Sequence, residues 1–110
     1  MVASYNEKNG IMVIEIKGDF DLSDSTSFEN TAKTILVKTN KILVDCTQLD
    51  YIDSSGIGQL IQLQMDISNA EGQMYLYNVN EFILNVFDIA DLLTFFKIIG
   101  EDEKKSLIGE

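Results

Sequence analysis

The stretch Lys41-Ile42-Leu43-Val44-Asp45-Cys46, followed a few residues later by Asp53-Ser54-Ser55-Gly56-Ile57-Gly58, decides the fold of this chain. The first six residues are mostly apolar and partly β-branched, which predicts a short buried strand. From Gln59 to Glu71 there is no proline and no glycine, and frequent apolar residues predict a helix that begins near Ser55. The polar block therefore lies where a strand turns into a helix, and it places two hydroxyls and a carboxylate at a helix N-terminus.

This helix N-terminus suggests a site for an anion. The first turn of a helix has unpaired backbone N–H groups and a partial positive charge, so a phosphate could bind there or be attached to Ser54 or Ser55. An ordinary explanation is also open, in which one serine only caps the helix and the glycines shape the turn. Glycine in a first helical turn costs up to about 1 kcal/mol relative to alanine, a cost that the close approach of another backbone would explain.

Strands and helices are expected to alternate along the rest of the chain. Strands are expected at 2–8, 11–16, 42–46, 74–79 and 95–99, with helices between 23 and 38, 55 and 71, 81 and 90, and 101 and 109. Asn9-Gly10 is a hairpin-type turn. The order β-β-α-β-α-β-α-β-α predicts a single α/β domain over residues 1–110, with a mixed, mostly parallel sheet of about five strands and about four helices.

The expected helix boundaries rest on capping residues. Ser23–Ser25 are candidate caps of the first helix, and Thr26 with Glu29 has the spacing of a capping box. Gly72 is a natural stop for the second helix, and Asn80 can cap the third.

Composition excludes several kinds of partner. The 110 residues include 18 acidic and 8 basic ones, for a formal net charge of −10, which argues against nucleic acid and against an anionic membrane. A basic protein partner or simple solubility fits better.

Met1–Gly10 does not resemble a signal peptide, no apolar run approaches the ~20 residues of a membrane helix, and Cys46 has no second cysteine to pair with. These features predict a cytoplasmic protein.

Enzymatic chemistry finds little support in the sequence. The chain has no histidine, so a Ser-His-Asp triad and a histidine metal site are impossible. Asp45, Asp50 and Asp53 leave a weak case for carboxylate or divalent-metal chemistry. The glycine-rich block lacks the lysine of a phosphate-binding loop and the three glycines of a dinucleotide site. We therefore predict no enzymatic activity, no cofactor and no metal.

The residues Tyr51–Gly58, after the strand at 42–46, closely resemble the signature of STAS-domain anti-sigma-factor antagonists. Gly18-Asp19-Phe20-Asp21 is similar to the turn that precedes the first helix in that family. Ile89–Ile98 is similar to its late segment, although Asp91 stands for the usual glycine and Leu93 for an aspartate. The resemblance covers nearly the whole chain.

The resemblance implies a bacterial partner switch that regulates transcription, as in a stress response. The unmodified protein would bind an anti-sigma factor that is also a serine kinase, and so release an alternative sigma factor. The kinase would then phosphorylate Ser55, the residue directly before Gly56, and end the complex, and a serine phosphatase would restore it. The expected partner-binding residues are Asp53, Ser54, Ser55, Gly56, Ile57 and Gly58, with Asp19 and Asp21 as a further contact.

Within this scheme Gly56 and Gly58 are expected to keep the surface flat for a partner. Three alternatives stay open. The chain could be a STAS adaptor for a different output, such as a phosphatase, a cyclase or a transporter. It could also be a small-molecule or nucleotide-binding module, or a structural subunit that uses the broadly apolar helix after Ser55.

Overall fold

The computed structural model describes all 110 residues and shows five strands and four α-helices. The elements are β1 (Val2–Lys8), β2 (Ile11–Phe20), the short 3₁₀ turn η1 (Leu22–Asp24), α1 (Ser25–Lys38), β3 (Lys41–Ile52), α2 (Ser54–Asn69), β4 (Gln73–Tyr77), α3 (Glu81–Ile89), β5 (Lys97–Ile99) and α4 (Glu101–Ile108). The sheet order is β1-β2-β3-β4-β5, with β1 antiparallel to β2 and all other pairs parallel. This confirms the expected order of elements and the mostly parallel sheet. None of the helices has both the length and the apolar character that a membrane crossing requires.

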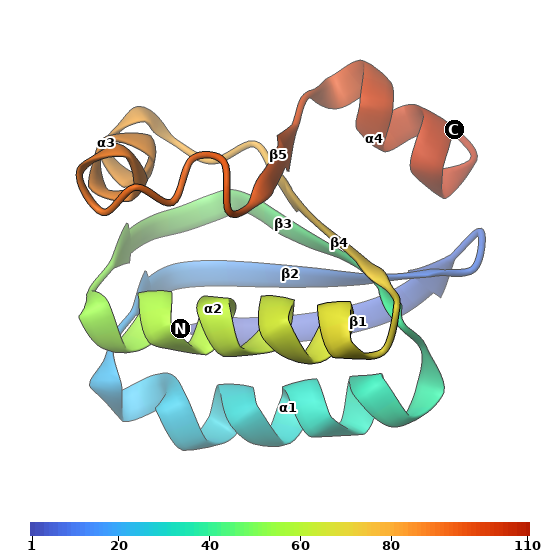
Figure 1. Ribbon diagram of the computed structural model, residues 1–110, viewed down its shortest axis with the longest axis horizontal. Helices are drawn as coiled ribbons and strands as arrows, with labels where there is room; N and C mark the ends of the chain where they lie inside the picture. Colours follow the sequence, from blue (N-terminus) through green and yellow to red (C-terminus); the bar gives the residue numbers. More distant parts are fainter.

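The sheet separates two hydrophobic cores of unequal size. Figure 1 shows α1 and α2 on one side of the sheet and α4 on the other. A main core of 20 buried residues joins one face of the sheet to α1, α2 and α3, whereas a core of five lies under α4. Successive residues of a strand point to opposite faces. In β2, Ile14 and Ile16 therefore enter the main core and Val13 enters the small one. Two covered faces explain why the central strands are continuous apolar runs in the sequence.

Cys46 belongs to the main core. Burial, with a smaller contribution from the charge of Asp45, raises the pKa of the Cys46 thiol to about 12. The thiol is therefore protonated at neutral pH and acts as a small apolar side chain, as expected for a free cysteine in a buried strand.

The start of α1 differs from the expected capping box. Asp21 and Asp24 form the box instead, because the Asp21 carboxylate accepts the N–H of Ser23 and the Asp24 carboxylate accepts the N–H of Asp21, both at 3.0 Å. The box closes η1, and α1 continues from Ser25 with no side-chain cap of its own. The pairing of Thr26 with Glu29 was wrong because the added 3₁₀ turn moves the cap to an earlier residue.

The bounds of four strands differ from the expected ones. β2 extends to Phe20 instead of ending at residue 16, and β4 is Gln73–Tyr77 instead of 74–79. β3 extends to Ile52, where Leu49 and Ile52 return to the main core. β5 begins only at Lys97, because the N–H groups of Phe95 and Phe96 both donate to the Leu92 carbonyl at 3.1 Å in a turn.

Gly72 is needed for a reason other than helix termination. The left-handed residue after α2 is Glu71, with φ of 56°. A Cβ on Gly72 would collide with the carbonyl of Asn40, and the Gln73 N–H donates to that carbonyl at 2.9 Å. Gly72 therefore lets the α2–β4 connection pass close to the α1–β3 connection.

Candidate functional site

Asp53 is the residue that caps α2. Its backbone is extended, and its Oδ1 accepts the N–H groups of Ser55 at 2.9 Å and Gly56 at 3.1 Å. The side-chain oxygen thus satisfies two of the donors that a helix leaves unpaired at its start. The explanation in which a serine serves as the cap is therefore wrong, because neither serine side chain caps α2.

The hydroxyls of Ser54 and Ser55 are free in the first turn of α2. Ser54 is exposed and Ser55 is half-buried. Neither hydroxyl takes part in a hydrogen bond, and no buried side-chain oxygen of the protein lacks a partner, so the Ser55 Oγ reaches solvent. Both oxygens are therefore available for covalent modification from outside.

The two glycines of the block have different surroundings. Gly56 is buried, and a Cβ there would lie 2.7 Å from both the Phe20 carbonyl oxygen and the Ile52 Cγ1. The expectation that Gly56 keeps the outer surface flat is wrong, because its missing side chain allows α2 to pack against the end of β2. Gly58 is exposed, with open space where its Cβ would be. Ile57 is half-buried and packs against the main core.

The Gly18–Asp21 segment lies directly beside the serine turn. The Asp53 N–H donates to the Phe20 carbonyl at 3.1 Å, and Asp19 is the register partner of Tyr51. The Asp19 side chain is exposed. The Ser23 hydroxyl, 2.6 Å from the Asp21 carboxylate, and the Ser23 N–H lower the pKa of Asp21. Asp21 therefore stabilises the local turn, and Asp19 is the freer of the two carboxylates.

An exposed aromatic pair adjoins the same turn. The rings of Tyr51 and Phe82 stack with their centroids 5.9 Å apart, and each residue is about half exposed. Asn80 holds α3 in this position, because its Oδ1 caps α3 at Ile83 N and its Nδ2 donates to the carbonyl of Leu49. Sequence patterns do not predict this pair, since nothing in the local sequence brings residue 51 next to residue 82.

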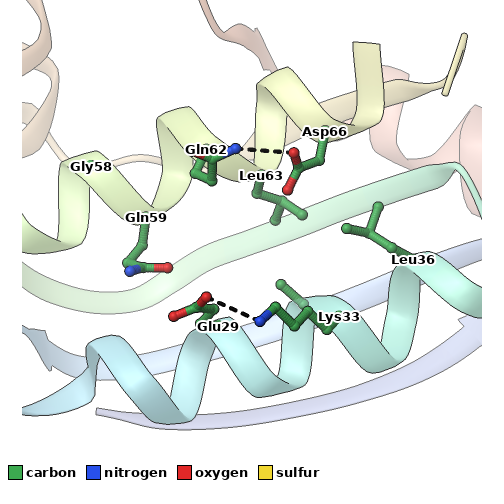
Figure 2. Close-up of a pocket in the computed structure, with 9 residues that line it drawn as sticks. Glu29, Lys33, Leu36, Gly58, Gln59, Gln62, Leu63 and Asp66 are labelled. Carbon is green, nitrogen blue, oxygen red and sulfur yellow. Dashed lines mark hydrogen bonds and ion pairs between the residues drawn. The ribbon is translucent and has the colours of Figure 1, made fainter. Parts of the chain in front are cut away.

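A groove of about 400 Å³ runs between α1 and α2, and it begins at Gly58. Figure 2 shows two pairs among its polar side chains, while Gln59 has no partner there. Lys33 is bound to Glu29 at 3.2 Å on α1, and Gln62 donates to Asp66 at 3.0 Å on α2. Each charged group is thus partnered within its own helix, and the only lysine of the groove already forms an ion pair with Glu29.

The three aspartates considered for catalysis or metal binding do not form a cluster. No three acidic, cysteine or histidine side chains of the protein come together as a metal site would require. Asp45 accepts hydrogen bonds from Thr47, and Asp53 is the α2 cap. Each carboxylate therefore has a separate local environment.

Removing the cap should weaken the domain measurably. Asp53→Ala is expected to lower the free energy of unfolding by about 1–2 kcal/mol, because the N–H groups of Ser55 and Gly56 lose their acceptor. Asp53→Asn keeps an oxygen in the same place and should lose much less. Urea unfolding monitored by circular dichroism measures both, and equal stability of Asp53→Ala and the unaltered protein would contradict the capping role.

Comparison with known proteins places this geometry in a family. A model of the STAS domain matches residues 3–104. A STAS-domain containing protein of Pseudomonas aeruginosa is 25% identical over 87 residues, which cover 79% of this chain and 86% of that one. The structure of TM1081 of Thermotoga maritima has a TM-score of 0.87 at 20% identity and covers 98% of this chain and 95% of that one.

The Bacillus protein SpoIIAA, an anti-sigma factor antagonist, has been solved in two forms. The unphosphorylated form has a TM-score of 0.75 at 17% identity, over 96% of this chain and 94% of that one. The phosphorylated form has a TM-score of 0.74 at 18% identity, over 96% of this chain and 97% of that one. With a family match over nearly its full length and the fold of these antagonists, the chain belongs to the STAS domain family.

Proposed function

We propose that the protein is an anti-sigma factor antagonist whose binding to a serine kinase is switched off by phosphorylation of Ser55. It would act in the cytoplasm by binding rather than by catalysis, and a serine phosphatase would reverse the switch. One observation carries the proposal. The Ser55 hydroxyl is solvent-accessible and unbonded at the start of α2, while the neighbouring Asp53 has taken over the capping task.

The choice of Ser55 over Ser54 comes from the family resemblance. Exposure alone would favour Ser54, which is the more open of the two. In the family the acceptor is the residue directly before the first glycine of the block, and that residue here is Ser55. Substituting each serine separately is therefore the decisive experiment.

A phosphate on Ser55 would alter the surface more than the fold. It adds about −1.5 to −2 charges, which the positive end of α2 offsets in part. The Asp53 carboxylate already binds the N–H groups of Ser55 and Gly56, so the phosphate would stay at the surface beside a like charge. A close-packed contact with a partner would then be obstructed, and the added charge would repel acidic groups there. Both the unphosphorylated and the phosphorylated form of SpoIIAA share the fold of this chain, which supports a fold that tolerates the modification.

The nucleotide-binding alternative has less support. The groove between α1 and α2 offers a phosphate only Lys33, whose amine is paired with Glu29. No lysine or arginine occurs between residues 42 and 96, so the turn at Ser55 brings no cation of its own. Phosphate cradles usually combine backbone N–H groups with such a cation.

Mass spectrometry of the intact protein, purified from its own cells, tests the switch. We expect one added phosphate that disappears on phosphatase treatment, complete loss of that phosphate in Ser55→Ala, and its retention in Ser54→Ala. The binding partner recovered with Ser55→Ala separates a sigma-factor switch from an adaptor with another output. Phosphate on Ser54, or none in the unaltered protein, would contradict the proposal.

A further inference from the structure

An apolar stripe on the outer side of α3 has no partner in the fold. Phe82, Val86 and Ile89 recur at i, i+4 and i+7, so they share one face of the helix. Phe82 is exposed, Val86 is half-buried and Ile89 is 87% exposed. Tyr51, stacked on Phe82, continues this surface to within two residues of Asp53. We name Tyr51, Phe82, Val86 and Ile89 the α3 stripe. An exposed apolar patch next to a functional turn is typical of a protein interaction site.

The α3 stripe lies at the end of the sheet where the serine turn is also found. Figure 1 shows α3 near the point at which β3 passes into α2. The position of α3 there is fixed, because the Asn80 Nδ2 donates to the Leu49 carbonyl at 3.0 Å. One partner that contacts Ser55 can therefore extend over Tyr51 onto α3 without any change in the domain.

The charged residues that neighbour the α3 stripe in the sequence are all acidic. Residues 42–96 contain eight of the 18 acidic residues of the chain and none of its eight lysines, and the chain has no arginine. Asp50, Glu81 and Asp88 are exposed next to members of the α3 stripe in the sequence. The surface thus combines exposed rings and aliphatic side chains with a rim of uncompensated carboxylates.

This combination of apolar and acidic groups indicates which kind of partner can bind to the α3 stripe. A second copy of the chain would bring two acidic rims together, and an anionic membrane or a nucleic acid would be repelled in the same way. A protein surface with lysine or arginine around an apolar ridge is complementary in both respects. An arginine can stack on the exposed rings of Tyr51 and Phe82 and pair with a carboxylate such as Glu81.

We propose that the α3 stripe is a docking surface for a basic, apolar ridge of the kinase that phosphorylates Ser55. The inference rests on the proposed function. It adds to that function the surface by which the kinase holds its substrate and the chemistry of this contact. The ridge of the kinase would pack on the α3 stripe while the kinase active site binds the Ser55 hydroxyl. The groove between α1 and α2, on another side of α2, fits this role less well, because its charged groups are already paired.

The test compares two exposed aliphatic residues that have matched positions. Ile89 lies in the last turn of α3 and is 87% exposed, and Val37 lies in the last turn of α1 and is 88% exposed. The probe is the kinase recovered from cells with Ser55→Ala and then purified, with the full chain as substrate. We expect Ile89→Ser and Phe82→Ala to raise KM about tenfold with little change in kcat, and Val37→Ser to leave KM unchanged.

Because the proposed partner surface is basic, KM for the unaltered protein should rise with salt concentration. The rise should be smaller for Asp50→Asn.

The outcomes separate this inference from the proposed function. If Ser55 is phosphorylated but KM is unchanged in Ile89→Ser and Phe82→Ala, the docking surface is wrong and the phosphorylation switch stands. An equal rise of KM in Val37→Ser would also contradict the docking surface. If no phosphate reaches Ser55, both proposals fail. Circular dichroism and urea unfolding of each variant confirm that the substrate remains folded.

Discussion

Ser55→Asp is expected to fold normally and to lose about 100-fold in affinity for the kinase. A fixed charge at the centre of a close-packed interface costs several kcal/mol when the partner cannot pair with it, and each 1.4 kcal/mol corresponds to a factor of about ten. The domain itself should not weaken, because an acidic side chain in the first turn of a helix is stabilising by about 0.3–1 kcal/mol. Isothermal titration of the purified kinase with the variant at physiological salt measures the loss.

Ser54→Asp is the matched control for this experiment. It adds the same charge in the same turn, but on the neighbouring and more exposed serine. We expect a smaller loss of affinity, since Ser55 is the proposed acceptor. A Ser55→Asp variant that binds as tightly as the unaltered protein, or a greater loss in Ser54→Asp, would contradict the proposed switch. Equal urea midpoints would show that neither change acts through unfolding.

Gly56→Ala is expected to lower the free energy of unfolding by about 2–3 kcal/mol, the upper range for overpacking a tight site. The new Cβ would lie 2.7 Å from the Phe20 carbonyl oxygen and from the Ile52 Cγ1. The carbonyl belongs to the backbone of β2 and cannot rotate away, so the start of α2 must move. That shift would also disturb the Asp53 cap and the position of Ser55. Urea unfolding measures the loss of stability.

Gly58→Ala separates packing from helix propensity. A Cβ at Gly58 meets nothing within 4 Å, and replacing a helical glycine by alanine gains about 0.5–1 kcal/mol. The same substitution two residues apart should therefore change stability in opposite directions. Loss of stability in both variants, or in neither, would contradict the packing that we assign to Gly56.

The sequence by itself was sufficient for the order of the elements. Hydrophobic periodicity is a local property, so it located the strand before Asp53 and the helix after it. Asn9-Gly10 specified the first hairpin, because both residues adopt positive φ, at 54° and 78°. The block around Ser55 was recognisable for the same reason, as a continuous run of residue types.

Only the tertiary structure decided what each residue of the site does. Asp53 acts as the cap because its carboxylate lies within hydrogen-bond distance of two N–H groups of α2. Gly56 is required because the Phe20 carbonyl, 36 residues away in the chain, lies close to it. The Tyr51–Phe82 stack likewise joins β3 to α3. Contacts of this kind come from the packing of distant segments, so local residue patterns do not predict them. The sequence therefore determined where the serine turn is, and the packing of distant segments determined which of its atoms are left free for a partner.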